Sequence, residues 1–541
     1  MGIDDPRPAE GAARPSNHND GMPTRDTAVE PVEDTAGDAP VEVGAPGTRP
    51  VLGAIALGIV VAAAAVLAVL LHRNGHARGD DFALYLRQAR SLFDGNPAEV
   101  VADNRFAVIN STGAFSPYAY PWGLPLLLSP FVHLWDLDYD RLKLVEVATF
   151  CIWLVLVHGV VRRRLGRTLA LAISAALATA PAFLSHTGQL LSEFPHATAV
   201  AVVIWWLDRM RTRGPITAAA ARDLVVLGVL VTVAYNFRRE AIVLVGVVAV
   251  VQLVELSARW RHDRLDRLPW RTVAIPHLAV VASAAGFQLL LPSMLFPDNG
   301  DSIEYVDDRL GGYPRVLTQQ LGLGSHPAIG VVILALALVG AVIGIRRRPA
   351  LDGPLAAVAM LSAVAVSTHF RMVGRYYFQV TPWVLYFASV VMVEAVRVVW
   401  RNRDPRFVAV FAALPLLYLI GVHGAVLPGD VGDVRDLDRI GQQTLGPTDP
   451  RVTPVFAAVM THTRPDDIIA FYRARTMTLY TDRRTIQSTL VERIRQRADY
   501  FAQQRGSDFY QPRLTEDQGR QLGFEIVWSD DLWILWKVNR Q

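Results

Sequence analysis

Cysteine is almost absent from this sequence of 541 residues. The single one, Cys151, lies inside a long apolar run, so no intrachain disulfide can stabilise any part of the chain. Lysine is also nearly absent, because only Lys143 and Lys537 occur and arginine supplies the rest of the positive charge. Charged residues make up only 19% of the chain, and hydrophobic residues make up 52%. This scarcity of charge indicates a membrane protein that crosses the bilayer several times.

Several common catalytic motifs are missing as well. The sequence has no His-Glu-x-x-His pair of zinc ligands, no Walker loop for nucleotide phosphates and no Gly-x-Ser-x-Gly nucleophile turn. It therefore gives no support to the hydrolase and nucleotide-binding classes that these motifs mark. The sequence pI near 9.0 could suggest a nucleic-acid partner. The basic residues lie between the apolar runs, however, so we expect no such partner.

Long apolar runs are abundant. Residues 51–71 form a run of 21 residues without a charge, enough to cross a hydrocarbon core of about 30 Å at about 1.5 Å per residue. Because roughly fifty polar residues precede this run, we do not expect a cleaved signal peptide. The other runs lie at about 142–161, 168–184, 193–208, 223–237, 240–257, 273–292, 327–345, 354–370, 376–396 and 407–427. We predict an all-α polytopic membrane protein with about eleven transmembrane helices.

The positions of the arginines predict how these helices are oriented. Short loops that carry positive charge stay on the cytoplasmic side of a membrane. The alternate loops are strongly basic, with arginine clusters at residues 162–167, 209–222, 259–271, 346–348 and 397–406. The alternation requires the apolar stretch from Tyr120 to Trp135 to lie at the membrane surface without crossing, as its prolines and Trp122 favour. The segments predicted to be outside are residues 72–138, the loop 297–326 and the chain after about residue 428.

The two ends of the chain differ in composition from the middle. Residues 1–50 are polar and rich in Pro and Gly, and we expect them to form a disordered cytoplasmic tail. Residues 51–428 are the predicted membrane domain, with a partly amphipathic first outer loop at 72–138. Residues 449–541 predict a small extracytoplasmic α/β domain. Its expected elements are helices at Val455–Thr463 and Thr489–Gln504 and strands at Asp467–Tyr472 and Trp533–Val538.

Two adjacent carboxylates, Asp80 and Asp81, follow the first predicted helix at its outer end. Aspartate is a favoured N-cap, so either residue could simply cap the amphipathic helix that comes next. A carboxylate here could also accept the proton of an acceptor hydroxyl as that hydroxyl attacks the anomeric carbon of a sugar. One carboxylate is enough for that reaction if the leaving group is a phosphate, which needs neighbouring cations but no protonation. The two interpretations are compatible.

Arginines on the outer side depart from the positive-inside rule and need a reason to be there. They occur as three pairs, Arg87 with Arg90, Arg238 with Arg239, and Arg371 with Arg375. Arginines at helix ends can act as anchors whose side chains reach the membrane surface, and for Arg87 and Arg90 we favour this interpretation. For Arg239 and Arg375 we favour phosphate binding. Both flank outer breaks between apolar runs, and guanidinium binds phosphate in a bidentate manner.

A further outer carboxylate, Glu193, follows Ser192 at the start of a predicted helix, where it could serve only as part of a cap. Together with Asp80, Asp81 and His196 it could also supply oxygen and nitrogen ligands to a divalent metal. Nothing in the spacing of these residues requires a metal. No cofactor is therefore certain, and a divalent metal stays an open alternative.

Five short motifs occur in order along the chain. They are Asp81-x-x-x-Tyr85-x-x-x-Ala89-Arg90, Tyr120-Pro121-x-Gly123-x-Pro125, Ser192-Glu193-x-Pro195, Arg238-Arg239-Glu240 and Gly374-Arg375-Tyr376. In these motifs the sequence resembles the C-type (GT-C) glycosyltransferases, which use sugars linked to polyprenyl phosphate. The similarity is to the bacterial branch related to protein O-mannosyltransferases and the lipid A aminoarabinose transferase, and it covers roughly residues 51–400.

The resemblance implies a polyprenyl-phosphate-linked donor, inversion at the anomeric carbon, and an acidic general base in the first outer loop. That base is then Asp81, because its spacing to Tyr85 matches the motif, and Asp80 is the rival. The implied donor-binding residues are Arg239, Arg375, Tyr85, Tyr120 and Glu193. Many relatives carry an acidic residue or a lysine beside the juxtamembrane proline motif, whereas this sequence has neither there.

The predicted function is the inverting transfer of a hexose or pentose from a polyprenyl-phosphate carrier to a glycan, lipid or protein acceptor. The reaction is expected on the outer face of the cell (plasma or inner) membrane. Two alternatives stay open. A transporter or flippase would be expected to hold ionisable residues deep in its helices, where Glu146, Glu255 and Glu394 come nearest, and to show paired repeats. A ligase or polymerase of lipid-pyrophosphate-linked glycans would also need outer arginines, but not the early aspartate.

Overall fold

The computed structural model describes residues 50–77, 79–112, 117–263, 269–295, 306–369, 373–439 and 446–539. All of them belong to one compact unit, Val43–Gln541. The tail predicted at residues 1–50 lies outside the described residues except for its last position.

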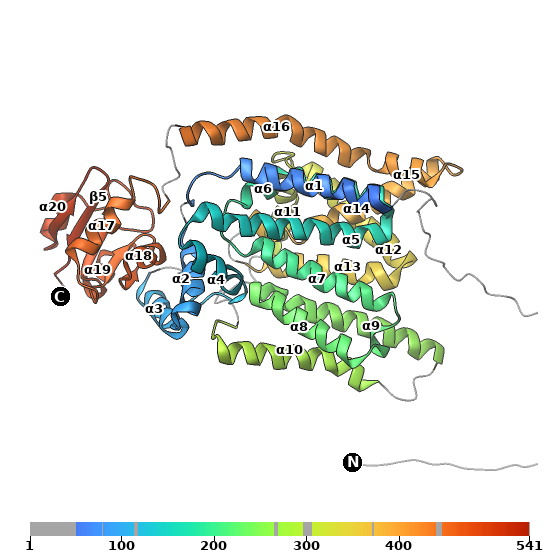
Figure 1. Ribbon diagram of the computed structural model, residues 1–541, viewed down its shortest axis with the longest axis horizontal. Helices are drawn as coiled ribbons and strands as arrows, with labels where there is room; N and C mark the ends of the chain where they lie inside the picture. The colour runs from blue at the N-terminus through green and yellow to red at the C-terminus, as the bar shows by residue number, and fades with distance from the viewer. Residues whose placement is uncertain are drawn as a thin grey trace, which may run out of the picture. The chain divides into compact units, whose positions relative to one another are not determined.

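Long α-helices dominate the described chain (Figure 1). The long helices are α1 Pro50–Leu70, α5 Tyr139–Thr179, α7 Glu193–Arg211, α8 Ala221–Phe237, α9 Val243–Asp263, α10 Trp270–Leu290, α12 Pro327–Arg347, α13 Pro349–Ser367, α14 Thr381–Val399 and α16 Leu414–Arg439. Shorter elements between them are α6 Pro181–His186, η1 Ile216–Ala218, η2 Arg239–Ile242, α11 Val306–Gln320, η4 Gly374–Tyr377 and α15 Pro405–Ala412. Extensive contacts join α12 to α14, α8 to α10, and α5 to both α1 and α7.

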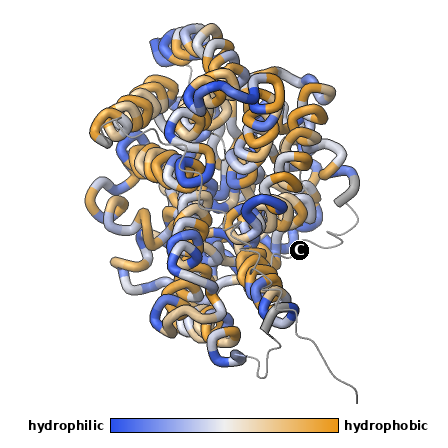
Figure 2. Tube along the Cα trace, turned by 90° about the vertical axis from the view of Figure 1, so that its right-hand side faces the viewer, coloured by the Kyte–Doolittle hydropathy of each residue, from blue (hydrophilic) through white to orange (hydrophobic). Residues whose placement is uncertain are grey.

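Eight helical segments of the described chain are long and apolar enough to cross a membrane, as expected for a multi-pass membrane protein. They are Val51–Leu70, Tyr139–Thr179, Arg239–Arg261, Trp270–Leu290, Pro327–Arg347, Pro349–Ser367, Thr381–Val399 and Pro405–Arg439. Hydrophobic residues recur along these helices (Figure 2). The predicted count of about eleven is not confirmed, because α7 and α8 are not among the eight and α5 combines two predicted runs.

The segment α5 contains two helical halves where the sequence predicts two runs, at 142–161 and 168–184, with a basic loop between them. The break is confined to Gly166, whose φ of 79° and ψ of 179° are non-helical. Glycine adopts this conformation without the clash that a Cβ would cause. The connection between the two halves is therefore much shorter than the pattern of arginines indicates.

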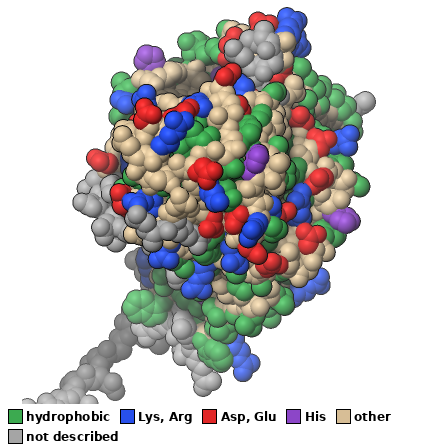
Figure 3. Space-filling model, turned by 90° about the vertical axis from the view of Figure 1, so that its left-hand side faces the viewer, with side chains coloured by type: hydrophobic (Ala, Val, Ile, Leu, Met, Phe, Trp, Pro, Cys, Tyr) green, Lys and Arg blue, Asp and Glu red, His purple; other side chains and the backbone are tan. Residues whose placement is uncertain are grey.

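Several helices leave large hydrophobic side chains exposed. In α10, Leu289 and Leu290 are 85% and 80% exposed, and Val281 is 65% exposed. Soluble proteins rarely leave large contiguous apolar patches in contact with water, whereas lipid tails would cover such a face. The surface seen in Figure 3 differs, because basic and acidic side chains are interspersed over it. Mixed charge of this kind is typical of a surface in contact with water.

Small residues allow α12 to approach its neighbours closely. A Cβ added to Gly340 would come within 1.9 Å of the carbonyl oxygen of Phe387 in α14. One turn later, a Cβ on Gly344 would lie 2.7 Å from the carboxylate of Asp352. This Gly-x-x-x-Gly spacing puts both glycines on one helix face, as in closely packed membrane helices.

A buried ionic cluster joins α5, α7 and α13. The side chain of Arg164 is 0% exposed and donates two hydrogen bonds, of 2.6 and 2.7 Å, to the carboxylate of Asp208. The Nε of Arg164 also donates to Asp352 at 3.2 Å. Asp352 is 0% exposed and accepts a hydrogen bond of 2.7 Å from the hydroxyl of Tyr386. The sequence pattern groups Arg164 with exposed loop arginines, but the fold buries it between two carboxylates.

Three short helices fill the segment between α1 and α5: α2 Asp81–Asp94, α3 Pro97–Asn110 and α4 Gly123–Trp135. With 13 residues, α4 is about 20 Å long and too short for a hydrocarbon core of about 30 Å. This length agrees with the expectation that the stretch from Tyr120 to Trp135 does not cross. The helix α2 packs against α4 and buries Phe82, Leu86 and Ala89. The start of α2 is therefore held firmly in the structure.

The C-terminal part of the described chain is α/β, as predicted. Its elements are α17 Thr453–His462, β1 Ile469–Phe471, α18 Ala474–Thr481, β2 Thr485–Ile486, α19 Val491–Arg497, β3 Tyr500–Gln504, α20 Glu516–Gln521, β4 Glu525–Ser529 and β5 Trp533–Lys537. The strands form one sheet in the order β2-β1-β3-β5-β4, with β1 parallel to β2 and β3. The strand β5 is antiparallel to its neighbours β3 and β4.

The helix predicted at Thr489–Gln504 is wrong in its second half. The helix α19 ends at Arg497, and Tyr500–Gln504 is the strand β3. This strand lies between β1 and β5 in the sheet, and four of its five residues are buried. Pairing on both edges and burial of its side chains outweigh the local preference for a helix.

Candidate active site

The N-terminus of α2 carries both predicted acidic residues, and the fold gives them different surroundings. Asp80 is the N-cap residue, but its side chain makes no capping hydrogen bond. Asp81 is the first residue of the helix. The capping role considered for Asp80 is therefore not seen, because its carboxylate binds a distant part of the chain instead.

Asp80 is buried, with 6% of its surface exposed. Its Oδ1 accepts hydrogen bonds from the backbone N–H of Thr476 at 3.0 Å and from the Thr476 hydroxyl at 3.3 Å. Burial raises the pKa of Asp80, although the nearby guanidinium of Arg475 opposes the shift. Asp80 thus joins α2 to α18, and little of its carboxylate is available to a substrate.

Asp81 is more open, with 45% of its side chain exposed. Its Oδ1 accepts a hydrogen bond of 2.6 Å from the hydroxyl of Tyr120 and lies 3.5 Å from Nη1 of Arg475. Burial, together with the negative charge of Asp81, raises the pKa of Tyr120 well above its usual value. Tyr120 therefore keeps its proton and stays a donor to Asp81. The carboxylate is held on one side and accessible on the other.

Glu193, at the first position of α7, is the centre of a second group of charged side chains. It is buried, and its Oε1 accepts hydrogen bonds from Arg238 at 3.0 Å and from Arg375 at 2.8 Å. Its Oε2 lies 3.3 Å from Nε2 of His186. Glu193 therefore holds two arginines in place, a role beyond the helix cap that the sequence suggested.

The two arginines flank the ring of Tyr376. The guanidinium carbons of Arg238 and Arg375 lie 4.4 and 5.4 Å from its centroid. Burial is the largest single influence and lowers the pKa of Arg375, but Glu193, Tyr376 and Asp81 together outweigh it, so the pKa ends above its ordinary value. Asp81 and Arg375 are thus near enough to interact electrostatically. The open carboxylate lies beside a region of concentrated positive charge.

Tyr85 connects the Asp81 group with the Glu193 group. Its ring stacks on that of Tyr120, with 4.3 Å between the centroids. Its hydroxyl donates to the Oγ of Ser192, which precedes Glu193, at 3.2 Å. Burial is the main cause of a raised pKa at Tyr85, so this hydroxyl keeps its proton. Four of the predicted donor-binding residues are therefore brought to one place: Tyr85, Tyr120, Glu193 and Arg375.

Arg239, the fifth predicted donor-binding residue, makes contacts elsewhere. Its guanidinium donates to the carbonyl oxygens of Met294 and Tyr235 and to the hydroxyl of Ser293. It also lies over the ring of Tyr235, 4.3 Å from the centroid. Its neighbour Arg238 is the one that reaches Glu193.

No protein-family model matches the chain, and neither does any curated protein sequence. Two crystal structures of ArnT from Cupriavidus metallidurans, one bound to undecaprenyl phosphate and one in the apo state, do match it. For both, the TM-score is 0.50 at 14% sequence identity, over 90% of this chain and 98% of theirs. The chain has the GT-C glycosyltransferase fold. The resemblance seen in the sequence motifs is thereby confirmed at the level of the fold.

A lower similarity is found to an archaeal oligosaccharyltransferase. This is AglB from Archaeoglobus fulgidus, in complex with an inhibitory peptide and a dolichol-phosphate. The TM-score is 0.46 at 14% identity, over 79% of this chain and 64% of that one.

One site residue of this GT-C chain was not predicted. Arg475, in α18, has only 4% of its side chain exposed and contacts both Asp81 and Tyr120. The available signal was its position, because Arg473 and Arg475 directly follow the strand predicted at Asp467–Tyr472. Residues just after a buried strand often carry function. Pattern alone could not show that this segment contacts α2, which lies hundreds of residues earlier in the chain.

The other arginines predicted to lie outside are apart from the Glu193 group. Arg87 pairs with Asp103 at 3.4 Å, and Arg90 pairs with Asp136 at 2.5 Å. Arg371 lies outside the described residues. The interpretation of Arg87 and Arg90 as anchors stays a prediction.

The predicted metal ligands do not form a site. Among the residues that the structure describes, no group of three or more His, Cys, Asp or Glu side chains could hold a metal ion. Asp80 is bound to Thr476, and Glu193 is bound to two arginines and a histidine. A divalent metal stays an open alternative.

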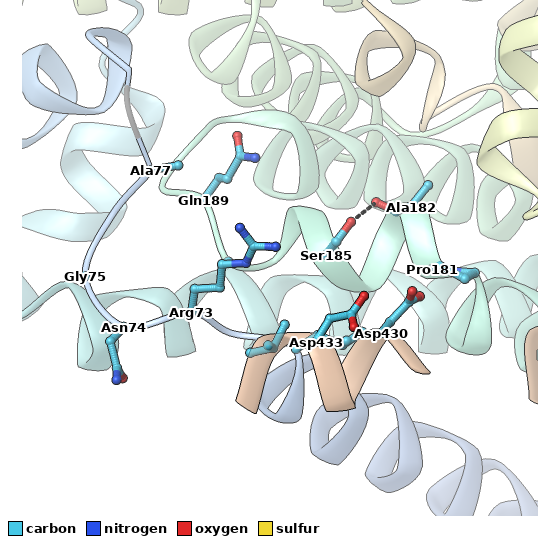
Figure 4. Close-up of a pocket in the computed structure, with 13 residues that line it drawn as sticks. Arg73, Asn74, Gly75, Ala77, Pro181, Ala182, Ser185, Gln189, Asp430 and Asp433 are labelled. Atoms are coloured by element: carbon cyan, nitrogen blue, oxygen red, sulfur yellow. Dashed lines mark hydrogen bonds between the residues drawn. The ribbon is translucent and has the colours of Figure 1, made fainter. Parts of the chain in front are cut away.

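A separate pocket of about 450 Å³ lies between the segment after α1, the helix α6 and the helix α16. Figure 4 shows Arg73 near Asp430 and Asp433 of α16, with Gln189 beside them. None of the predicted site residues is among the described residues that line this pocket. The helix α6 borders both regions, because Ser185 lines the pocket while His186 binds Glu193.

Proposed function

We propose that this protein is an inverting glycosyltransferase. It moves a monosaccharide from a polyprenyl-phosphate carrier to an acceptor on the outer face of the cell (plasma or inner) membrane. The observation that carries the proposal is Asp81, a half-exposed carboxylate held by Tyr120 and Arg475 and lying near Arg375. The shared fold supports it, since one of the matching ArnT structures is bound to undecaprenyl phosphate.

Asp81 is proposed as the general base. Its carboxylate accepts the proton of an acceptor hydroxyl while that oxygen forms a bond to the anomeric carbon of the sugar. The bond from that carbon to the carrier phosphate breaks, and the phosphate leaves with the electron pair. Attack from the side opposite the phosphate inverts the anomeric centre. The contacts of Asp81 with Tyr120 and Arg475 both fall on Oδ1, so Oδ2 is the atom best placed to take the proton.

Arg375 is proposed to bind the carrier phosphate, with Arg238 beside it. Arg375 donates to Glu193 through Nε, and its Nη atoms make no hydrogen bond to any residue that the structure describes. The guanidinium is therefore oriented and still has donors for phosphate oxygens. Glu193 keeps the two cations close together, which offsets their mutual repulsion. Their charge stabilises the phosphate as negative charge develops on it.

The outer placement of the active site rests on the arginine pattern of the loops, and one contact agrees with the predicted topology. The first loop and the C-terminal segment were both predicted to be outside, from separate parts of the chain. The hydrogen bonds between Asp80 and Thr476 join these two segments, as they must if both lie on one side of the membrane. Opposite sides would be incompatible with this contact.

The donor can be tested without knowledge of the acceptor. Membranes that contain the protein also contain its acceptor, and they should release polyprenyl phosphate from a panel of hexoses and pentoses linked to undecaprenyl phosphate, as followed by chromatography. The panel also distinguishes a hexosyl- from a pentosyltransferase. Transfer directly from a nucleotide sugar by lipid-free protein would refute the proposal. Use of a pyrophosphate-linked oligosaccharide alone would favour the ligase or polymerase alternative.

Replacing Arg375 with Met should weaken donor binding. A hydrogen bond to a charged group contributes about 1.5–3 kcal/mol, which corresponds to a rise of roughly 10- to 100-fold in the KM for the donor. The matched control is Arg239→Met, which removes a guanidinium that is already bound by protein oxygens. It should lower the folded yield and leave the donor KM of the folded fraction unchanged. A larger KM effect at Arg239 would return the phosphate site to that residue.

A further inference from the structure

Two adjacent residues at the start of α2 meet two adjacent residues at the start of α18. Asp80 accepts hydrogen bonds from Thr476, and Asp81 forms an ion pair with Arg475. Asp80 and Thr476 are 396 positions apart in the sequence. The buried contact of Asp80 therefore sets the position of α18, and with it the position of Arg475 beside the proposed base.

The guanidinium of Arg475 is held on several sides. Its Nε donates to Asn104 at 3.1 Å, its Nη2 donates to the carbonyl oxygen of Pro117 at 2.7 Å, and its Nη1 donates to the hydroxyl of Tyr120 at 3.3 Å. The same Nη1 lies 3.5 Å from Asp81. Because a guanidinium is planar and rigid, these contacts fix its orientation as well as its position.

The surroundings of Arg475 leave little room for movement. The cavity that it lines with Arg87, Asn104 and Thr478 measures about 10 Å³. A single water needs roughly 10–15 Å³ measured in this way, so the interface is close to fully packed. Burying a guanidinium costs free energy unless charge and hydrogen bonds compensate it. The contacts described for Arg475 lie in residues 81–120, so this buried charge serves the first loop.

We infer that Arg475 is a positioning residue of the active site, which holds Asp81 and Tyr120 in the geometry needed for proton transfer. The C-terminal α/β segment thereby completes the site. Arg475 reaches Oδ1 of Asp81 from the packed side and leaves the exposed side to the acceptor. The inference rests on the proposed function, because it assigns the base to Asp81.

Kinetics with the sugar donor that the wild type uses test this role. Arg475→Met should lower kcat by roughly 10- to 100-fold, since a misplacement of about 1 Å can cost that much, and should leave the donor KM nearly unchanged. The kcat of Arg475→Lys should lie between those of the wild type and Arg475→Met, because lysine keeps the positive charge but lacks the planar guanidinium. The double variant Asp81→Asn with Arg475→Met should be no slower than Asp81→Asn alone. Additive losses, or normal turnover in Arg475→Met, would overturn the inference.

Two control variants separate positioning from docking of the segment. Thr476→Val removes the hydroxyl donor to Asp80 but keeps the backbone N–H donor that holds α18 in place, and Arg484→Met removes an ion pair of 3.2 Å with Asp103. Neither residue contacts Asp81 in the described chain, so both should keep near-normal kcat. If these two variants lose as much kcat as Arg475→Met does, the effect of Arg475→Met comes from weaker docking of the C-terminal segment. That result would overturn the inference.

Hydrogen exchange tests the same geometry without a substrate. Arg475→Met should raise amide exchange at residues 117–122 and at the start of α2 more than Arg484→Met does. Equal exchange in the two variants would overturn the positioning role whether or not sugar transfer is observed. If the wild type transfers no sugar but Arg475→Met still raises amide exchange more than Arg484→Met does, the proposed function would be wrong and the positioning role would stand.

Discussion

Replacing Asp81 with Asn should reduce turnover by roughly 10²-fold or more, because the amide cannot accept a proton from the acceptor hydroxyl. The side-chain oxygen of Asn can still accept the hydrogen bond of Tyr120, so the start of α2 should keep its structure. Turnover should be measured as release of polyprenyl phosphate, and donor affinity in a separate binding assay. We expect donor affinity and the unfolding temperature to stay close to those of the wild type.

The matched variant is Asp80→Asn, one residue earlier. Asp80 is buried and bound to Thr476, and an Asn oxygen can accept the same hydrogen bonds. Turnover should therefore stay near normal, although the contact between α2 and α18 weakens. An inactive Asp80→Asn with a fully active Asp81→Asn would move the base by one residue. Full activity in both would remove the catalytic role of this loop.

Asp208→Asn should be one of the most destabilising single substitutions in the protein. It leaves the fully buried guanidinium of Arg164 without the carboxylate that now accepts two of its hydrogen bonds. Breaking a buried ion pair on one side typically costs about 3–5 kcal/mol, a large part of the stability of a folded domain. The measurement is the unfolding midpoint of the detergent-solubilised protein, together with the folded yield.

Two comparisons show whether burial is the cause. Asp436→Asn breaks an ion pair with Arg439 in which both side chains are more than 70% exposed, and it should leave the midpoint nearly unchanged. Combining Arg164→Met with Asp208→Leu should recover much of the loss, since it removes both charges of the broken pair while Asp352 keeps its ion pair with Arg348. Equal effects of Asp208→Asn and Asp436→Asn would contradict the buried cluster.

The placement of segments was largely predictable, because it depends on local properties of the chain. Hydrophobic runs of sufficient length form helices in a membrane whatever their partners are. The short apolar stretch that became α4 and the strands β1 and β5 were recognised in the same way. The prediction failed at Tyr500–Gln504, where the state of the chain depends on neighbours on both edges of a sheet.

It was harder to predict which of two adjacent residues of the same type lies in the active site. Arg238 and Arg239 are equivalent by type and position, and the sequence favoured Arg239. The fold directs Arg238 to Glu193 and uses Arg239 to bind Met294 and Ser293. Successive side chains leave a helix end in different directions, so the segments packed around it decide which one faces the site.

Composition and hydropathy were enough to predict a multi-pass membrane protein with a C-terminal α/β segment, and the motif resemblance indicated the GT-C fold. The sequence also showed which loops carry the acids and arginines, because hydrophobicity, length and residue type are local properties. The burial of Asp80 against Thr476, the exposure of Asp81 and the contact of Arg475 with the proposed base became visible only in the folded chain. Those outcomes depend on contacts between segments far apart in the chain, for which a single sequence contains no local signal.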